Sequence, residues 1–177
     1  MTQWASVTVV DYGVGNLLSV RRAFEACGAE VKLTDDKYAI DNAERLVLPG
    51  VGAFGDCANE IARRRLMEPL RAFARSGRPF LGICVGMQIL LETGEEFGRH
   101  DGLGLIAGRV RQIEPTAADG TPHKIPHIGW MPLDVPAAQG EGGWSGTVLA
   151  DVRPGARAYF VHSFTAEPEE ERDRLAD

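Results

Sequence analysis

The chain of 177 residues has 44% hydrophobic residues and a formal net charge of −6. This length and composition predict a single globular domain over residues 1–177 with a sizeable core. The acidic balance argues against nucleic acid or an anionic membrane as the main partner, because both call for a basic surface. No apolar run approaches the roughly 20 residues that span a bilayer, and the start lacks a signal-peptide pattern, so we expect a cytoplasmic protein.

The cysteines give no sign of a disulfide framework or of a metal centre. Cys27, Cys57 and Cys84 are odd in number and widely spaced, and no C-x-x-C pair occurs. This pattern predicts three free thiols and no zinc site, and nothing in the sequence calls for a cofactor.

The first half of the chain alternates between strand and helix patterns. The β-branched residues 7–10 predict a strand, and a glycine turn leads from it to a helix that Asn16 would cap and Gly28 would end. Residues 30–34 and 45–48 predict two further strands. Because strands that alternate with helices form parallel sheets, we expect an α/β fold with a mainly parallel central sheet.

A glycine-rich loop, residues 49–55, follows the third predicted strand. In an open α/β sheet, a loop at the carboxyl end of a strand faces the ligand crevice. Its three glycines expose backbone N–H groups, so the loop can donate hydrogen bonds to an oxyanion; a merely flexible turn explains the same composition equally well. A single helix over residues 56–76 is expected next, with a solvated, arginine-rich face.

The fourth predicted strand ends at the most informative residue of the chain, Cys84. Gly82 and Gly86 flank it in a G-x-C-x-G pattern, which is the thiol version of a nucleophile elbow. The helix that follows has unpaired N–H groups, which favour a thiolate and can hold an oxyanion, with the N–H of Val85 as one donor. The alternative is a buried structural cysteine; the two glycines and Gln88 favour a nucleophile.

Acidic residues follow the elbow. We expect the helix to continue through Leu91, so that Glu95 and Glu96 would lie at its C-terminus, where carboxylates oppose the helix dipole. This unfavourable placement makes Glu95 or Glu96 a candidate for holding a substrate ammonium group, and a solvated acidic turn is the alternative.

The pattern changes to short β segments from residue 103 onward. Residues 106–113, 124–128 and 158–161 read as strands, with turns rich in glycine, proline and aspartate between them. They predict an additional antiparallel β layer. The last stretch, residues 167–177, is highly charged and is expected to fray.

Five passages together resemble one family. The passage Gly82-Ile83-Cys84-Val85-Gly86-Met87-Gln88 alone is typical of class I glutamine amidotransferases. The whole set, in this order, resembles the glutaminase subunits of imidazole glycerol phosphate synthase, from histidine biosynthesis, over about residues 7–165. The other four passages are Asp11-Tyr12-Gly13-Val14-Gly15-Asn16, Pro49-Gly50-Val51-Gly52-Ala53-Phe54, Pro126-His127-Ile128-Gly129-Trp130 and Tyr159-Phe160-Val161-His162-Ser163.

The resemblance implies a flavodoxin-like α/β fold, with helices on both faces of the central sheet, which this chain would hold in a C-terminally incomplete form. It also implies that Cys84 attacks the side-chain amide of glutamine, releasing ammonia and leaving a glutamyl thioester that water hydrolyses to glutamate. The ammonia would pass to the synthase (cyclase) subunit, the partner in a heterodimer, which forms imidazole glycerol phosphate and AICAR.

The resemblance further implies roles for individual residues. The oxyanion hole would involve Val51, Gly52 and Val85. The glutamine would be surrounded by Gly52, Gln88, Glu96, Ser163 and Phe164. The synthase subunit would lie against Asn16, His127 and Trp130.

The sequence departs from the family pattern at three places. Met131 stands where the family usually has asparagine, and Phe164 where it usually has tyrosine. The catalytic histidine and acid of the family lie in a Phe-His-Pro-Glu passage that this sequence does not contain, so we expect turnover by the 177-residue chain to be impaired. His162 is the only substitute base that the sequence offers.

Three alternatives remain at this point. The first is the glutaminase of pyridoxal phosphate synthase, which the Gly-Trp and Asp-Tyr-Gly passages disfavour. The second is a non-catalytic, partner-binding protein of the same fold, and the third is a different cysteine hydrolase on a flavodoxin-like sheet. Glutamine-dependent formation of a thioester would separate the glutaminase of imidazole glycerol phosphate synthase from the second and third.

Overall fold

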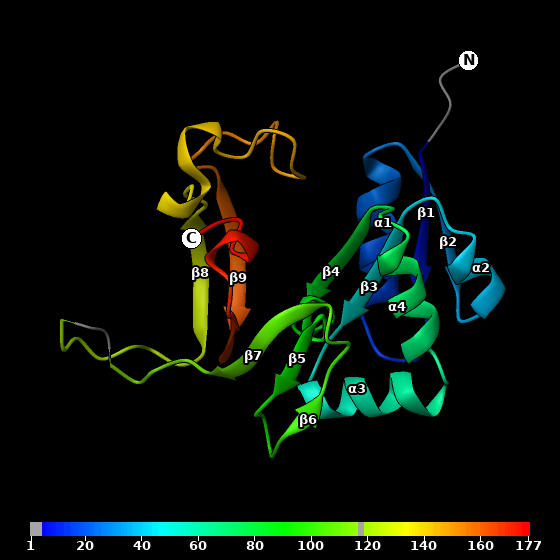
Figure 1. Cartoon of the computed structure of the whole chain (residues 1–177), viewed down its shortest axis with the longest axis horizontal. Coiled ribbons are helices and arrows are strands. Elements are labelled where there is room, and N and C mark those ends of the chain that lie inside the picture. Colours follow the sequence, from blue (N-terminus) through cyan, green and yellow to red (C-terminus); the bar gives the residue numbers. More distant parts are fainter. Residues whose placement is uncertain (1–4, 117–118) are drawn as a thin grey trace. The chain divides into compact units, whose positions relative to one another are not determined.

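The computed structural model describes residues 5–116 and 119–177 of the chain (Figure 1). The chain divides into two compact units, Met1–Val110 and Arg111–Asp177. The expectation of a single domain over residues 1–177 stays a prediction.

The first unit is built on a sheet of four parallel strands (Figure 1). The strand order β2-β1-β3-β4 is that of the flavodoxin-like folds, which confirms the predicted fold class. All five residues of β3 are buried, as expected for a strand that helices cover on both faces. The strands are β1 (Ala5–Val10), β2 (Ala29–Thr34), β3 (Leu46–Gly50) and β4 (Phe80–Cys84).

Helix α1 (Leu17–Ala26) covers one face of this sheet. It begins as predicted, since the side chain of Asn16 accepts a hydrogen bond from the Ser19 N–H at 3.3 Å. It ends near Gly28, whose φ of +80° suits the residue after a helix. The apolar side chains of Leu17, Val20 and Phe24 pack against a buried cluster of Val7, Val9 and Val47.

Helix α4 (Met67–Arg75) covers the opposite face. The rings of Phe73 and Phe80 meet edge to face, with their centroids 5.8 Å apart. Phe80 is the register partner of Leu46, and side chains alternate along a strand, so Phe80 lies on the face opposite Val47. Helices therefore lie on both faces of the sheet, as predicted. Two further helices of the first unit are α2 (Lys37–Asp41) and α3 (Phe54–Arg63).

The prediction of one helix over residues 56–76 is wrong, because α3 and α4 are separate. Arg65 adopts a left-handed φ of +58° between them. The N–H of Leu66 donates to the Ile61 carbonyl at 2.9 Å, and the N–H of Arg65 donates to the Ala62 carbonyl at 2.8 Å. These bonds form a Schellman motif, which ends a helix and normally has glycine where this chain has Arg65.

The helix after the elbow is also shorter than predicted. Helix α5 (Val85–Gln88) has a single turn, and the chain continues as strand β5 (Leu91–Gly94). The carbonyls of Ile89 and Leu91 accept hydrogen bonds from the N–H groups of Leu103 (2.7 Å) and Gly104 (3.0 Å). This pairing with a distant segment keeps residues 89–92 from continuing the helix, so Glu95 and Glu96 do not lie at a helix C-terminus. Strand β5 pairs with β6 (His100–Asp101) and β7 (Ile106–Gln112).

The second unit contains two of the three strands predicted for the antiparallel layer, whereas the third, β7, pairs in parallel with β5. Strands β8 (His127–Pro132) and β9 (Arg157–His162) pair in antiparallel register over their whole length (Figure 1). Strand β8 begins three residues later than predicted. The other elements are the 3-10 helix η1 (Ala137–Gly142), strand β10 (Phe164–Pro168) and the 3-10 helix η2 (Glu171–Asp173).

The C-terminal stretch is not frayed, contrary to the prediction from its charge. The backbones of Asp134 and Asp177 exchange two hydrogen bonds of 3.0 Å. The indole N–H of the buried Trp144 donates to the Leu175 carbonyl at 2.6 Å. Backbone and indole groups make these bonds, so the charge of the segment does not prevent it from packing.

Candidate active site at Cys84

Cys84 lies at a sharp turn between β4 and α5. Its backbone angles are φ +56° and ψ −122°, a conformation that side-chain-bearing residues rarely adopt. Such strain persists only where the surrounding structure holds it, and it is the hallmark of a nucleophile elbow. The thiol is exposed at this turn.

Close backbone packing explains the two glycines that flank Cys84. A Cβ at Gly86 would overlap the carbonyl oxygen of Leu48 in β3, and one at Gly82 would overlap the backbone of Met87. A Cβ at Gly50 would lie 2.5 Å from the backbone nitrogen of Gly86. Three backbone segments thus meet at distances that only glycine permits. The G-x-C-x-G pattern is therefore a requirement of this packing.

The three thiols differ in their surroundings. Cys57 is fully buried in α3, and this burial raises the pKa of its thiol. Cys27 is exposed, but it lies at the C-terminal cap of α1 rather than at a strained turn. Cys84 alone combines exposure with the elbow conformation, which supports it as the candidate nucleophile.

The glycine-rich loop begins beside the elbow, as predicted. Gly50, at the end of β3, is the register partner of Cys84, at the end of β4. Val51 and Gly52 follow directly and are exposed, and Gly52 has φ +84°. Val85 and Gln88 are buried in the single turn of α5 on the other side of Cys84. The structure thus places four predicted site residues on the two segments that flank the thiol.

Glu96 reaches this loop from another part of the unit. Its carboxylate accepts a hydrogen bond from the N–H of Phe54 at 2.9 Å and so caps α3, since the N-cap residue Ala53 has no side-chain acceptor. Glu95 instead pairs with Arg109 at 3.4 Å. Of the two predicted candidates, Glu96 is therefore the one that lies next to the glycine-rich loop.

Sequence reasoning missed two buried residues that contact the same loop. The Tyr12 hydroxyl donates a hydrogen bond to the Pro49 carbonyl at 2.7 Å. The Cys57 thiol donates to the Val51 carbonyl at 3.2 Å. Two sequence positions could have indicated these contacts. Tyr12 follows Asp11 at the end of the first predicted strand, and Cys57 lies in the first turn of the helix after the loop.

The remaining predicted glutamine-site residues belong to the second unit. His162 ends β9, and Ser163 and Phe164 follow it. The Nδ1 atom of His162 lies 2.9 Å from the Phe164 carbonyl oxygen. A carbonyl only accepts hydrogen bonds, so Nδ1 donates, and in the neutral ring this tautomer leaves the lone pair on Nε2.

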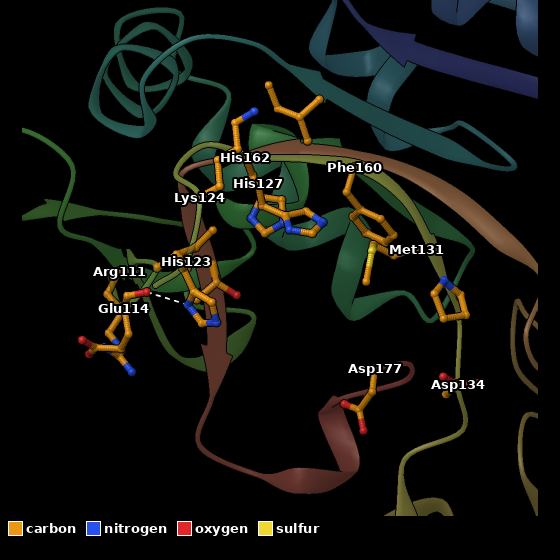
Figure 2. Close-up of a pocket in the computed structure, with 14 residues that line it drawn as sticks. Arg111, Glu114, His123, Lys124, His127, Met131, Asp134, Phe160, His162 and Asp177 are labelled. Carbon is orange, nitrogen blue, oxygen red and sulfur yellow. Dashed lines mark hydrogen bonds and ion pairs between the residues drawn. The ribbon is translucent and has the colours of Figure 1, made fainter. Parts of the chain in front are cut away.

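A cavity of about 640 Å³ opens beside one face of the β8–β9 pair (Figure 2). His127 and His162 are direct cross-strand partners, and their ring centroids lie 5.4 Å apart. Figure 2 shows the rings of His127 and His162 next to each other and Phe160 beside Met131. The lining also includes three carboxylate side chains, those of Glu114, Asp134 and Asp177, so the cavity is not a purely cationic site.

The opposite face of the β8–β9 pair is apolar and exposed. Ile128, Trp130, Tyr159 and Val161 are each more than half exposed. They form two cross-strand pairs, and the rings of Trp130 and Tyr159 lie 5.6 Å apart. Because side chains alternate along a strand, His127 and Trp130 point to opposite faces. The third predicted partner contact, Asn16, belongs to the first unit.

Residues 5–116 and 119–177 contain no cluster of three or more side chains that could bind a metal ion. In the same residues no helix is both long enough and apolar enough to cross a bilayer.

Comparisons with known proteins identify the family. Residues 8–176 match the family described as "Glutamine amidotransferase class-I". The chain is 51% identical to "Imidazole glycerol phosphate synthase subunit HisH 1" of Legionella pneumophila (strain Lens), over 98% of this chain and 80% of that protein. It is 46% identical to the HisH subunit of Rhodopirellula baltica, over 92% of this chain and 73% of that protein.

Among solved structures, "Structure of PurLQS from Thermotoga maritima" matches with a TM-score of 0.64 and 22% identity, over 96% of this chain and 72% of that one. This likeness shows the fold alone, whereas the two relatives show the family. The strained Cys84 elbow and the parallel sheet that supports it fit the same assignment. The chain belongs to the class I glutamine amidotransferases and, within them, to the HisH subunits of imidazole glycerol phosphate synthase.

Proposed function

We propose that this chain hydrolyses glutamine with Cys84 as the nucleophile and supplies the ammonia to a synthase subunit. The observation that carries the proposal is the conformation of Cys84, an exposed thiol held at φ +56° between two glycines that the packing requires. Strain of this kind costs free energy and has no evident structural use at an exposed position. It projects the thiol toward a substrate.

The reaction has two steps. The Cys84 thiolate attacks the side-chain amide carbon of glutamine, a C–S bond forms, and the carbonyl oxygen becomes an oxyanion. The oxyanion then collapses, the C–N bond breaks, and the leaving nitrogen takes a proton to depart as ammonia. Water attacks the resulting thioester in the same way and releases glutamate and the free thiol.

Backbone N–H groups on both sides of Cys84 are the proposed oxyanion donors. Val85 is the first residue of α5, where N–H groups have no partner within the helix. Val51 and Gly52 belong to the exposed loop that starts beside Cys84. Donors aimed at the developing charge typically supply the largest single contribution to such a reaction.

The proposed contacts with glutamine follow the family resemblance. Gln88 and Glu96 lie on segments next to the elbow and the loop, and the carboxylate of Glu96 suits the ammonium group of an amino acid. Ser163 and Phe164 would complete the glutamine site, and the lone pair on Nε2 makes His162 the histidine to test as a base.

The proposed partner is the synthase subunit, bound as a heterodimer. The exposed apolar face of β8–β9 supports this, since aromatic residues are enriched among the side chains that dominate binding at protein interfaces, and Trp130 lies on this face beside Tyr159. Asn16 and His127 are the other proposed contacts. The acidic charge fits a protein partner better than nucleic acid, and a cytoplasmic location belongs with this biosynthetic role.

The test measures ammonia release from glutamine with the synthase subunit and its ligand present. Cys84→Ser should reduce the rate to background, because it removes the thiol that attacks the amide carbon. Cys27→Ser is the matched control, since it removes an exposed thiol outside the elbow and should leave the rate unchanged. Ammonia release by Cys84→Ser at the parent rate would refute the proposal.

A further inference from the structure

Two buried side chains hold the loop between β3 and α3. The Tyr12 hydroxyl donates to the Pro49 carbonyl at 2.7 Å, and the Cys57 thiol donates to the Val51 carbonyl at 3.2 Å. Both side chains have an exposed fraction of 0%. The two carbonyls that they hold lie on either side of Gly50, the residue paired with the elbow cysteine.

Both groups keep their protons and therefore remain donors. Burial raises the pKa of the Cys57 thiol, and burial beside Cys57 raises the pKa of the Tyr12 hydroxyl well above its usual range. A carbonyl oxygen can only accept hydrogen bonds, so each contact depends on the hydroxyl or thiol hydrogen. Cys57 thus acts as a donor here and not as a second nucleophile.

The contact from Cys57 fixes the orientation of one peptide group. Peptide groups are planar and trans, so a Val51 carbonyl directed at Cys57 points the N–H of Gly52 the opposite way. Cys57 is buried and Gly52 is exposed, so this N–H points away from the core and toward the surface of the loop. The thiol of Cys84 is exposed as well.

Without that contact, the loop has little to keep this orientation. Gly52 has φ +84°, and no atom lies within 4 Å of the place where a Cβ would stand. Glycine adopts positive and negative φ almost equally easily, so the peptide between Val51 and Gly52 has two accessible orientations. The hydrogen bond from Cys57 selects one of them.

We propose that Cys57 and Tyr12 are positioning residues, which aim the backbone N–H groups of this loop at the oxyanion that forms on the substrate of Cys84. The inference rests on the proposed function, because the oxyanion exists only if Cys84 attacks a carbonyl carbon. One neutral hydrogen bond corresponds to about a five-fold change in a population, so the loss of either contact has a measurable effect on rate.

The test compares two reactions of the Cys84 thiol. In the first, an aryl ester of the glutamate side-chain carboxyl acylates it: a C–S bond forms, an oxyanion forms and collapses, and the aryloxide leaves with the electrons of the broken C–O bond. An aryloxide departs without taking a proton, so this rate reports the thiolate and its oxyanion donors. In the second, iodoacetamide alkylates the thiol and iodide leaves, with no oxyanion at any stage.

Cys57→Ala and Tyr12→Phe should each lower the acylation rate about five-fold while changing the alkylation rate less than about two-fold. Cys57→Ser restores a hydroxyl donor and should recover most of the acylation rate. Peptide mass mapping assigns every adduct to its cysteine.

An acylation rate for Cys57→Ala equal to that of the parent would overturn the inference. An equal fall in the acylation and alkylation rates would also overturn it, because that result would indicate general damage to the elbow. A Cys57→Ser acylation rate as low as that of Cys57→Ala would overturn it as well. The proposed function has a separate readout: it fails if Cys84→Ser is acylated at the parent rate.

Discussion

The Cys84 elbow and the β8–β9 pair are both candidate functional regions, and they are built in different ways. At the elbow, backbone segments of β3, β4 and α5 pack at distances that only glycine allows, and they hold one residue in a strained conformation. The β8–β9 pair is a regular two-stranded ladder with histidines on one face and exposed apolar side chains on the other. The elbow depends on backbone fit, whereas the strand pair depends on its side chains.

Because of this difference, amino-acid substitutions should have different consequences in the two regions. At the elbow, an added methyl group changes the backbone and therefore the chemistry of Cys84. On the strand pair, a change of side chain leaves the backbone in place and alters only what that face can bind. The predictions below test this contrast, from the largest expected effect to the smallest.

Adding a methyl group at Gly86 should have the largest effect on stability. Its Cβ would overlap the Leu48 carbonyl, so Gly86→Ala should lower the free energy of unfolding by about 3 kcal/mol, as overpacking does in a close-packed core. Gly129→Ala in β8 is the matched control, since no atom lies within 4 Å of its Cβ position. Its effect should stay within about 0.5 kcal/mol. Urea unfolding followed by circular dichroism measures both, and equal stabilities would break the comparison.

Removing the largest side chain of the apolar face should affect binding and not folding. Trp130→Ala should weaken the complex with the synthase subunit by about 2 kcal/mol, or roughly 30-fold in affinity, as buried aromatic anchors do. His127→Ala, on the other face of the same strand, should have a smaller effect. Titration calorimetry measures both affinities. An unchanged affinity for Trp130→Ala would exclude this face as the docking surface.

Removing the backbone strain at the left-handed turn between α3 and α4 should stabilise the fold by a smaller amount. Arg65 has φ +58°, which glycine adopts without strain, so Arg65→Gly should raise the free energy of unfolding by about 1 kcal/mol. Arg63→Gly, inside the last turn of α3, should lower it by a similar amount, about 1 kcal/mol. Thermal unfolding measures the sign of each change, and a destabilising Arg65→Gly would contradict the account of this turn.

The sequence predicted the elbow well because the residues that the elbow requires are neighbours in the chain. A strand that ends at a cysteine between two glycines needs no knowledge of distant contacts, since the glycines report the close packing directly. The same holds for α1, where Asn16 and Gly28 mark the two ends. The parallel sheet followed from the alternation of strand and helix patterns.

The failures arose where distant contacts or unusual residues decide the structure. An arginine occupies the turn at Arg65, where glycine would have signalled a helix end. The carbonyls of Ile89 and Leu91 pair with residues 103–104, which periodicity within the sequence cannot reveal. The charged C-terminal stretch packs through a backbone contact at Asp177 that composition does not report.

The candidate site was predicted in part for the same reasons. The nearness of the glycine-rich loop and of Val85 to Cys84 followed from the predicted order of strands and loops, whereas the roles of Val51, Gly52 and Gln88 came from the family resemblance and stay predictions. Three-dimensional packing determines two further contacts, which are the capping of α3 by Glu96 and the hydrogen bond from Tyr12 to the loop. The opposite orientations of His127 and Trp130 require one strand to run through both residues, whereas the sequence pattern ended this strand at residue 128.

The identity of the reactive thiol tests the central claim most directly. The chain is treated with a glutamine-like electrophile, digested, and mapped by mass spectrometry. Because Cys84 alone combines exposure with the elbow conformation, a single adduct should appear on the peptide that contains it, and Cys84→Ser should abolish the adduct. A dominant adduct on the buried Cys57 or on the exposed Cys27 would contradict the assignment of Cys84 as the nucleophile.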